Sequence, residues 1–322
     1  MSKSNNDIML AISVPPFWHC GRTIRGNSLH TLAALAPALV MSILMWGIPA
    51  LRVTALSVFT AMAAEFLCQK AMGQRCTQDN FTAAVTGVLF AFLLPASAPW
   101  WIVVIGVSCA ICLGRMAFGG YGANPVSAVL VGWAMVFVSF PAQMDAASTV
   151  LMTEYIDPLL RLKYFGASAV ADMSYADLLL GFQLGGLGAT QAGLLFLGGL
   201  YVIFRGVIRW EIPLAFFVGV VITAFCFQMS DSTRYADPLF HICTGSTVLA
   251  AFFLATEDAC CPHRRLPMIL YGLTGGALVI IIRVFGMYTD GAPFAVMLIN
   301  LLAPMFGLIK TPPFGSRKED KR

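Results

Sequence analysis

Charged residues are scarce in this chain of 322 residues. Asp, Glu, Lys and Arg make up 11% of it and hydrophobic residues 58%, and the mean hydropathy is +0.79. A water-soluble fold cannot bury so much apolar side-chain surface. Hydrophilic segments are scarce as well, and the one of useful length is 145–190. These shortages exclude a nucleotide-binding or soluble catalytic domain, so any chemistry must take place within a membrane or on a bound cofactor.

The sequence also shows no cleavable signal peptide and no cysteine spacing typical of a disulfide framework. Residues 1–30 are mixed in character, and the nine cysteines are odd in number and lie mostly in or beside apolar stretches. Cys109 and Cys112 form a C-x-x-C motif. We expect them to pack as small apolar groups. The alternative, half of an iron–sulfur site, requires a partner chain to supply the other two thiolates.

Ten apolar stretches are present instead, several of them near the roughly 20 residues that a helix needs to cross a bilayer. They run approximately over 32–51, 53–68, 82–95, 98–116, 125–144, 191–204, 212–229, 241–255, 267–285 and 292–309.

The basic residues separate when the gaps between these stretches are assigned alternately to two sides. Fifteen of the twenty Lys and Arg residues fall on one side, and only Arg52, Arg161, Lys163, Arg234 and Arg283 fall on the other. Because Lys and Arg resist translocation, the rich side is expected to be cytoplasmic, with ten spans and both termini inside. This asymmetry also explains the net charge of +4, so we expect no nucleic-acid partner.

An internal repeat relates the two halves of the chain. Val88-Leu-Phe-Ala-Phe-Leu-Leu94 recurs as Val248-Leu-Ala-Ala-Phe-Phe-Leu254. Each copy is followed by an Arg, Gly, Tyr and Pro, beginning at Arg115 and Arg283, with one residue of slippage between the two sets. Five spans per half would cross the membrane in opposite senses. Inverted repeats often place a binding site where the halves meet, at interrupted helices. The Gly- and Pro-rich joints at 119–125 and 286–293 fit such a site or, alternatively, ordinary turns.

Few polar residues lie near the spans, and each costs free energy unless it is paired or hydrated. We expect Glu65, Glu211 and Glu257 to mark span ends at the lipid headgroups. Four short polar side chains are better candidates for contacts with a ligand or a helix end, because they lie near Gly and Pro: Asp79, Asn124, Asp290 and Asn300.

Six segments resemble one membrane family in their order and spacing. They are Gly119-Gly-Tyr-Gly-Ala-Asn-Pro125, Arg209-Trp-Glu-Ile-Pro213, Pro238-Leu-Phe-His241, Ala251-Phe-Phe-Leu-Ala-Thr256, Tyr288-Thr-Asp-Gly-Ala-Pro-Phe-Ala-Val296 and Asn300-Leu-Leu-Ala-Pro304. From about residue 30 to 309 the chain is similar to the RnfD family of the Rnf electron-transport complex. That family is related to NqrB of the sodium-pumping NADH:quinone oxidoreductase.

The resemblance implies an all-α polytopic protein of about ten transmembrane helices in two inverted five-helix repeats. The expected parts are a cytoplasmic segment 1–31, repeats 32–144 and 191–309, an outer loop 145–190 and a basic cytoplasmic tail 310–322. It also implies a location in the bacterial plasma (inner) membrane and a place in a complex that moves electrons between ferredoxin and NAD while transporting Na+ or H+. The implied partners are the outer flavoprotein RnfG, the membrane proteins RnfA and RnfE and the iron–sulfur proteins RnfB and RnfC.

The implied cofactors are riboflavin within the membrane and FMN bound on the outer side through a phosphoester to a threonine. Read in register with the family, Asp157 occupies that threonine's position, and a carboxylate cannot replace the hydroxyl. Thr190, in Gly188-Ala-Thr190, is the other candidate for attachment, and its alternative role is the N-cap of the following helix.

Two further positions depart from the family pattern. Ser127 replaces an asparagine, which leaves Asn124 as the clearer riboflavin contact, and Glu257-Asp258-Ala259 lacks the family's proline. The predicted cofactor contacts are therefore Thr190, Asn124, Asp79 and Asp290. The alternative function is a channel or carrier that has kept the inverted-repeat scaffold and lost its redox cofactors.

Overall fold

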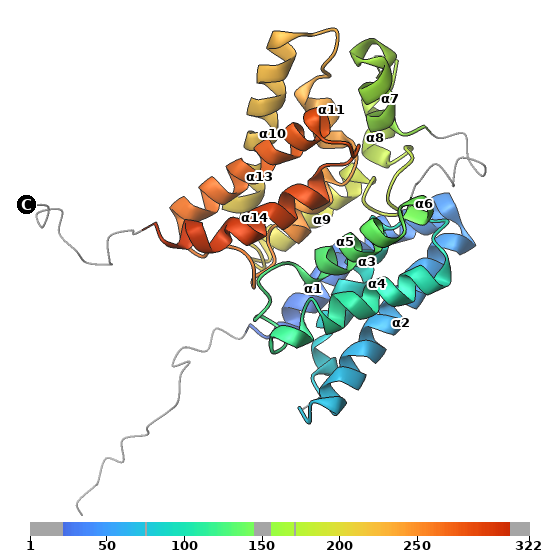
Figure 1. The fold of residues 1–322 in the computed structure, drawn as a ribbon, viewed down its shortest axis with the longest axis vertical. Coiled ribbons are helices and arrows are strands. Elements are labelled where there is room, and N and C mark those ends of the chain that lie inside the picture. Colours follow the sequence, from blue (N-terminus) through green and yellow to red (C-terminus); the bar gives the residue numbers. More distant parts are fainter. Residues whose placement is uncertain (1–21, 75, 145–155, 171, 310–322) are drawn as a thin grey trace, which may run out of the picture.

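The described part of the chain is helical throughout its regular structure. The computed structural model describes residues 22–74, 76–144, 156–170 and 172–309. The longer helices are α1 (Ile24–Trp46), α2 (Ile48–Ala71), α3 (Thr82–Leu93), α4 (Trp100–Cys112), α5 (Ala128–Ser139), α9 (Ala192–Phe204), α10 (Glu211–Ser230), α13 (Arg265–Phe285) and α14 (Ala292–Gly307) (Figure 1). The shorter ones are η1 (Gln78–Asn80), η2 (Met116–Phe118), α6 (Pro141–Met144), α7 (Pro158–Phe165), η4 (Ala167–Val170), α8 (Tyr175–Leu180), α11 (Pro238–Cys243), α12 (Thr247–Leu249) and the π-helical η5 (Ala250–Leu254).

Five helical segments in the described ranges are long and apolar enough to cross a membrane. They are Ile24–Trp46, Ile48–Ala71, Trp100–Phe118, Glu211–Ser230 and Arg265–Phe285. Four shorter apolar helices, α3, α5, α9 and α14, accompany them. Each of the ten apolar stretches thus corresponds to helical structure, and the fold is that of a helical membrane protein.

The boundary between the first two stretches differs from the prediction. We expected a break beside Arg52, but α1 ends at Trp46 and α2 begins at Ile48. The break lies at Gly47, whose φ of 67° favours glycine, and Pro49 follows in the first turn of α2. Arg52 therefore belongs to α2, where its Nη2 donates to the Ala98 carbonyl at 3.2 Å, and is not a loop charge.

The eighth stretch is divided into α11, α12 and η5 instead of forming one helix. Gly245, with φ 65°, separates α11 from α12, and α12 continues directly into the π-helical η5. An added Cβ at Gly245 would lie about 3 Å from Arg283 Nη2, Leu159 Cδ1 and Asp290 Oδ1. Because residue 245 is a glycine, the backbone between α11 and α12 can pass close to Arg283 and Asp290.

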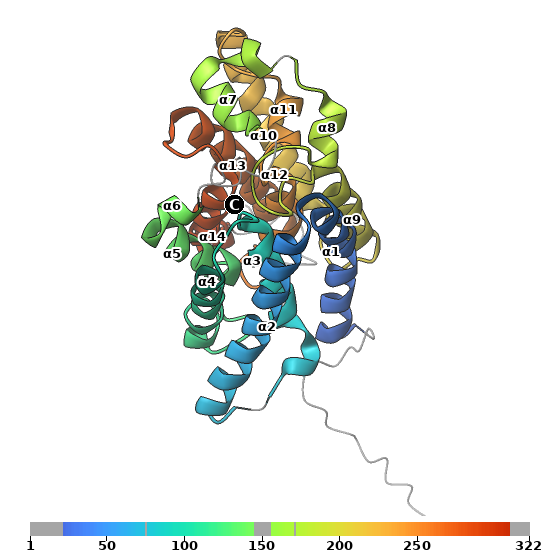
Figure 2. The ribbon, with the colours of Figure 1, turned by 90° about the vertical axis from the view of Figure 1, so that its right-hand side faces the viewer.

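The helices form two groups that follow the halves of the chain (Figures 1 and 2). In the first group α2 packs against α3 and α4, and α4 against α5. In the second group α10 packs along α13, which packs against α14. The groups meet where α1 contacts α9. One apolar core, which includes Phe90, Phe92, Phe216 and Phe252, runs through both groups.

The segment predicted as an outer loop contains helices of its own. α7, η4 and α8 lie beside α11 at one end of the molecule (Figure 1). A small separate core holds them there, formed by Leu159, Val170, Leu178, Ala236, Phe240 and Cys243. This packing fixes the position of Asp157, the residue that precedes α7.

Candidate functional site

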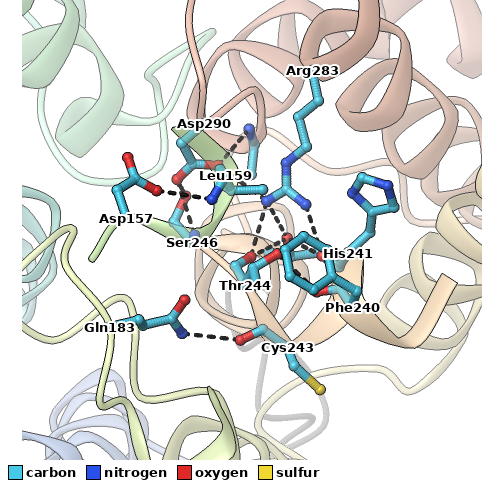
Figure 3. A network of polar contacts seen from close by, with 12 residues as sticks. Asp157, Leu159, Gln183, Phe240, His241, Cys243, Thr244, Ser246, Arg283 and Asp290 are labelled. Carbon is cyan, nitrogen blue, oxygen red and sulfur yellow. Dashed lines mark hydrogen bonds and ion pairs between the residues drawn. The ribbon is translucent and has the colours of Figure 1, made fainter. Parts of the chain in front are cut away.

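Arg283, near the end of α13, is the centre of a buried polar network (Figure 3). Its Nη1 donates to the His241 carbonyl at 2.7 Å, and its Nη2 donates to the Thr244 carbonyl at 3.0 Å and to Thr247 Oγ1 at 2.7 Å. The interruption around Gly245 supplies these acceptors, because it leaves carbonyl groups outside a regular helix. Arg283 was predicted as a loop charge on the outer side. The structure instead places Arg283 within α13 with a buried side chain, so it is not a loop charge, while its assignment to the outer side stays a prediction.

Asp290, in the turn between α13 and α14, completes this network. Its Oδ1 lies 3.2 Å from Arg283 Nη2, and its Oδ2 accepts the Ser246 backbone N–H at 2.9 Å and the Ser246 hydroxyl at 2.5 Å. The carboxylate therefore links the turn at the end of α13 to the start of α12. Asp290 is a predicted site residue.

A cavity of about 350 Å³ opens beside Asp290, and we call it the Asp290 cavity. Trp133, Phe137 and Tyr288 provide aromatic surface in its wall, and Asp157, Ser246 and Asp290 provide polar groups. Phe137 and Tyr288 meet edge to face, with ring centroids 4.9 Å apart. Since α5 belongs to the first group of helices and Ser246 and Asp290 to the second, the cavity lies between the two halves.

Asp157 lines the Asp290 cavity beside the network, at the start of α7 (Figure 3). Its Oδ1 accepts the Leu159 and Leu160 backbone N–H groups, at 2.9 and 3.3 Å, so it is the N-cap of α7. Burial raises the pKa of Asp157 to about 6. The two N–H donors oppose this rise, and the nearby Asp290 charge adds to it. The chain thus places a second carboxyl in this cavity, with its pKa raised above the ordinary value.

Thr190 lies beside the Asp290 cavity but does not line it. Its side chain is 1% exposed, and its hydroxyl donates to the Gly186 carbonyl at 3.3 Å, whereas the neighbouring Ala189 reaches the cavity wall. The N-cap of α9 is Gln191, so the capping role suggested for Thr190 is wrong. Gln183 fixes this segment, because its Nε2 donates to the carbonyls of Thr190 and Cys243 at 2.9 and 3.0 Å (Figure 3 shows the second bond).

Arg115 is a second buried arginine, in the first half of the chain. Arg115 Nη2 donates to Thr86 Oγ1 at 2.6 Å, and its Nη1 lies 3.9 Å from Glu65 Oε1. Glu65 was predicted to lie at the headgroups. It is instead inside α2 and 2% exposed, because Arg115 gives it a buried partner. Arg115 lies in the turn after α4, as predicted, but its side chain is buried and not free in a loop, and its cytoplasmic side stays a prediction.

The Arg115 side chain and its neighbours border a smaller hollow of about 100 Å³, the Arg115 cavity. Thr82, Thr86, Tyr121, Phe252 and Glu257 are among the residues that line it. The ring of Tyr121 lies over the Arg115 guanidinium, with 5.3 Å from Cζ to the ring centroid. Like the Asp290 cavity, this hollow combines residues of both halves.

Asp79, Asn124 and Asn300, the remaining polar candidates, lie outside both cavities. Asp79 is exposed in η1. Asn124 is buried, and its Nδ2 donates to Glu257 Oε1 at 3.1 Å, which ties the first Gly-rich turn to the end of η5. Asn300 accepts the Tyr271 hydroxyl within the second group of helices. The structure thus brings Asp290 into a cavity and separates it from Asp79 and Asn124.

Comparisons with known proteins agree with the resemblance seen in the motifs. Residues 11–314 match the model of the NQR2, RnfD, RnfE family. The subunit designated D in the Na(+)-translocating ferredoxin:NAD(+) oxidoreductase complex of Acetobacterium woodii is 32% identical, over 93% of each chain. The subunit of the same designation in the ion-translocating oxidoreductase complex of Alcanivorax borkumensis is 34% identical, over 83% of this chain and 85% of that one. Its counterpart in the proton-translocating ferredoxin:NAD(+) oxidoreductase complex of Clostridium ljungdahlii is 31% identical, over 96% and 97%. This chain therefore belongs to the NQR2, RnfD, RnfE family.

Proposed function

We propose that this chain is a membrane-embedded, flavin-carrying subunit of an ion-translocating ferredoxin:NAD oxidoreductase. The similarity to the equally designated subunits of such complexes extends over nearly the whole of each chain, which supports the same role. Relatives at about the same identity are named for Na+ and for H+, so the proposal covers either ion. The other subunits of the complex, including an outer flavoprotein and iron–sulfur subunits, are the proposed partners, together with membrane lipid.

The proposed topology has ten spans in two inverted halves, with both termini on the cytoplasmic side of the plasma membrane. Arg115 and Arg283 are buried inside the protein, and without them the basic residues still divide 14 to 4 between the two sides. Each of these arginines also donates to a threonine hydroxyl just before its copy of the repeated segment, Thr86 two residues before Val88 and Thr247 one residue before Val248. These similar contacts, one residue out of register, support a structural repeat.

We propose that the flavin binds in the Asp290 cavity. The main support is the mixture of aromatic and polar side chains that line this cavity. Its volume of about 350 Å³ falls in the range of small-molecule pockets, about 300–1,000 Å³. Isoalloxazine is planar, largely apolar and edged with hydrogen-bonding atoms. The aromatic side chains of Trp133 and Tyr288 fit its faces, and Ser246 and Asp290 fit its edges.

A phosphate group does not fit the same cavity. Two carboxyls, Asp157 and Asp290, line the space, and the nearby cations are already engaged, Arg283 with Asp290 and Lys163 with the carbonyls of Gly286 and Met287. A phosphate dianion would therefore meet like charge in a partly desolvated site. For this reason we assign riboflavin to the Asp290 cavity in preference to FMN. Covalent FMN at Thr190 would require its buried hydroxyl to leave the Gly186 carbonyl and turn outward.

The protein's part in the chemistry is to bind and to adjust the flavin, which supplies one- and two-electron transfer when bound. The aromatic wall would exclude water from the faces of a bound ring. Asp290, held by Arg283 and Ser246, is a fixed hydrogen-bond acceptor. Asp157, whose pKa is about 6, holds or releases a proton at its carboxyl as the charge in the cavity changes.

The Arg115 cavity, with about 100 Å³, is smaller than a flavin requires without side-chain movement. Asn124 and Asp79 line neither cavity and remain predicted contacts for a second flavin. Glu257, which joins Asn124 to the cavity wall, is the residue through which Asn124 would act on such a ligand.

Flavin extraction from the purified protein tests the proposal. The protein is denatured in acid, and the supernatant and pellet are analysed by absorbance and by liquid chromatography with mass spectrometry. We expect riboflavin in the supernatant and no flavin fluorescence in the protein band of a denaturing gel. Absence of flavin from both fractions would contradict the proposal and favour the channel or carrier.

A further inference from the structure

Cys68 of α2 and Cys112 of α4 form a pair of thiols, with 3.1 Å between their Sγ atoms. The two residues are 44 positions apart in the chain, and both side chains are half-buried. The sequence motif joins Cys112 to Cys109 instead. The packing of α2 against α4 therefore gives Cys112 a partner that the spacing does not reveal.

The geometry favours a bond between Cys68 and Cys112 over one within the C-x-x-C motif. A disulfide requires about 2.05 Å between sulfurs and about 3.5–4.5 Å between Cβ atoms. Cys68 and Cys112 need to approach by about 1 Å to meet the first requirement. Residues three apart on a helix have Cβ atoms about 5–6 Å apart, so a Cys109–Cys112 bond would distort α4.

A metal site is a weaker explanation of these thiols. Cys109 is the nearest further candidate ligand, yet across the described ranges no three His, Cys, Asp or Glu residues are grouped so that they could hold a metal ion. Two thiols in contact without a further ligand are the arrangement of a dithiol.

We propose that Cys68 and Cys112 are a reversible dithiol/disulfide pair that fastens α2 to α4 when oxidised. The two thiols lose two protons and two electrons and form one S–S bond. A low-molecular-weight disulfide takes up the electrons and protons and is released as two thiols. The reaction proceeds through a mixed disulfide on one cysteine, which the other cysteine then resolves.

The position of the pair gives the bond a structural consequence. Cys68 lies three residues after Glu65 on α2, and Cys112 lies three residues before Arg115. These are the two residues of the buried ion pair beside the Arg115 cavity. The bond would therefore fix the spacing of the two helices that carry this pair, and it does so whether or not the protein binds flavin.

Peptide mapping of the full-length protein tests the proposal. The protein, in native membranes, is treated with oxidised glutathione, alkylated without reduction, digested and analysed by mass spectrometry. We expect a linked peptide pair joining Cys68 to Cys112, lighter by about 2 Da than the sum of the two reduced peptides. Reduction with dithiothreitol should abolish the linked pair.

Three variants provide the controls. Cys68→Ser and Cys112→Ser should each abolish the linked pair, and Cys109→Ser, one turn away on α4, should retain it in full. Absence of the linked pair in the parent would overturn the proposal. So would a dominant Cys109–Cys112 or Cys68–Cys109 bond in the parent.

Discussion

Arg283 and Asp290 form an ion pair across the turn that joins α13 to α14, with 3.2 Å between Nη2 and Oδ1. The arginine side chain is 3% exposed and the aspartate side chain 31% exposed, so the pair runs from the interior to the edge of the Asp290 cavity. Because Arg283 also binds carbonyls at the end of α11, the pair fixes the cavity wall to the interruption around Gly245.

Removal of the Arg283 side chain is expected to destabilise the protein strongly. Arg283→Ala leaves Asp290 without its cation and leaves the carbonyls of His241 and Thr244 without their donor. Loss of one partner of a buried pair costs about 3–5 kcal/mol. Arg265→Ala is the matched control, since Arg265 is 87% exposed and lies 3.9 Å from Glu211, and its loss should cost under about 1 kcal/mol. Thermal unfolding in detergent should show a much lower midpoint for the first variant alone.

Substitution of Asp290 is expected to reduce flavin retention. Asp290→Ala removes a charged acceptor from the cavity wall, a loss that corresponds to about a tenfold weaker ligand affinity. Asp177→Ala changes an exposed aspartate of α8 that lines neither cavity, and it should retain the parent's flavin. The flavin-to-protein ratio after gel filtration measures both effects. Equal loss in the two variants would mean that the flavin is bound elsewhere.

The pH dependence of stability should report on Asp157. Its pKa rises from 3.8 to about 6 on folding, so the folded state binds the proton more tightly. This group's contribution to stability is therefore complete below pH 3.8 and is lost as the pH rises through about 6. The loss amounts to no more than about 3 kcal/mol.

Asp157→Asn isolates this contribution, because asparagine still caps α7. Unfolding midpoints are measured from about pH 4 to about pH 8 for parent and variant, a window that brackets the folded-state pKa. The parent should lose stability relative to the variant as the pH rises through about 6. Parallel curves would show that Asp157 keeps an ordinary pKa in the folded protein.

The crossing of α10 and α13 should be sensitive to one added methyl group. A Cβ at Gly276 would lie 2.0 Å from the Phe216 carbonyl oxygen, so Gly276→Ala must push the helices apart. We expect a loss of about 1–3 kcal/mol and poor yield from membranes. Gly307→Ala adds the same methyl group where nothing lies within 4 Å, and it should be neutral or slightly stabilising. Similar yields and similar unfolding midpoints for both variants would show that α10 and α13 do not approach each other so closely at Gly276.

Hydropathy predicted the helical segments well, because apolar runs of this length have few alternatives in a membrane. It missed the ends of those segments. The break at Gly47 lies inside an unbroken apolar run, and the interruption at Gly245 depends on contacts with Arg283 and Asp290, far along the chain. Such boundaries are decided by tertiary packing and not by composition.

The candidate site was predicted in part. Asp290 lies in a cavity, as a short polar residue beside glycine and proline suggested, but the aromatic wall from Trp133 and Phe137 gave no local signal. Arg115 and Arg283 were counted as loop charges because each stands at the end of an apolar run. Their acceptors, Thr86 and Thr247, lie 29 and 36 residues away in sequence, so the spacing alone does not indicate that either arginine is buried.

The most direct measurement is an electron cryomicroscopy map of the assembled complex at a resolution that shows flavin rings. We expect planar three-ring density in the Asp290 cavity, against Trp133 and Tyr288, with no density continuing into the Thr190 side chain. A cavity that contains only lipid or water, or a flavin joined to Thr190 through a phosphate, would contradict the assignment of riboflavin to this cavity.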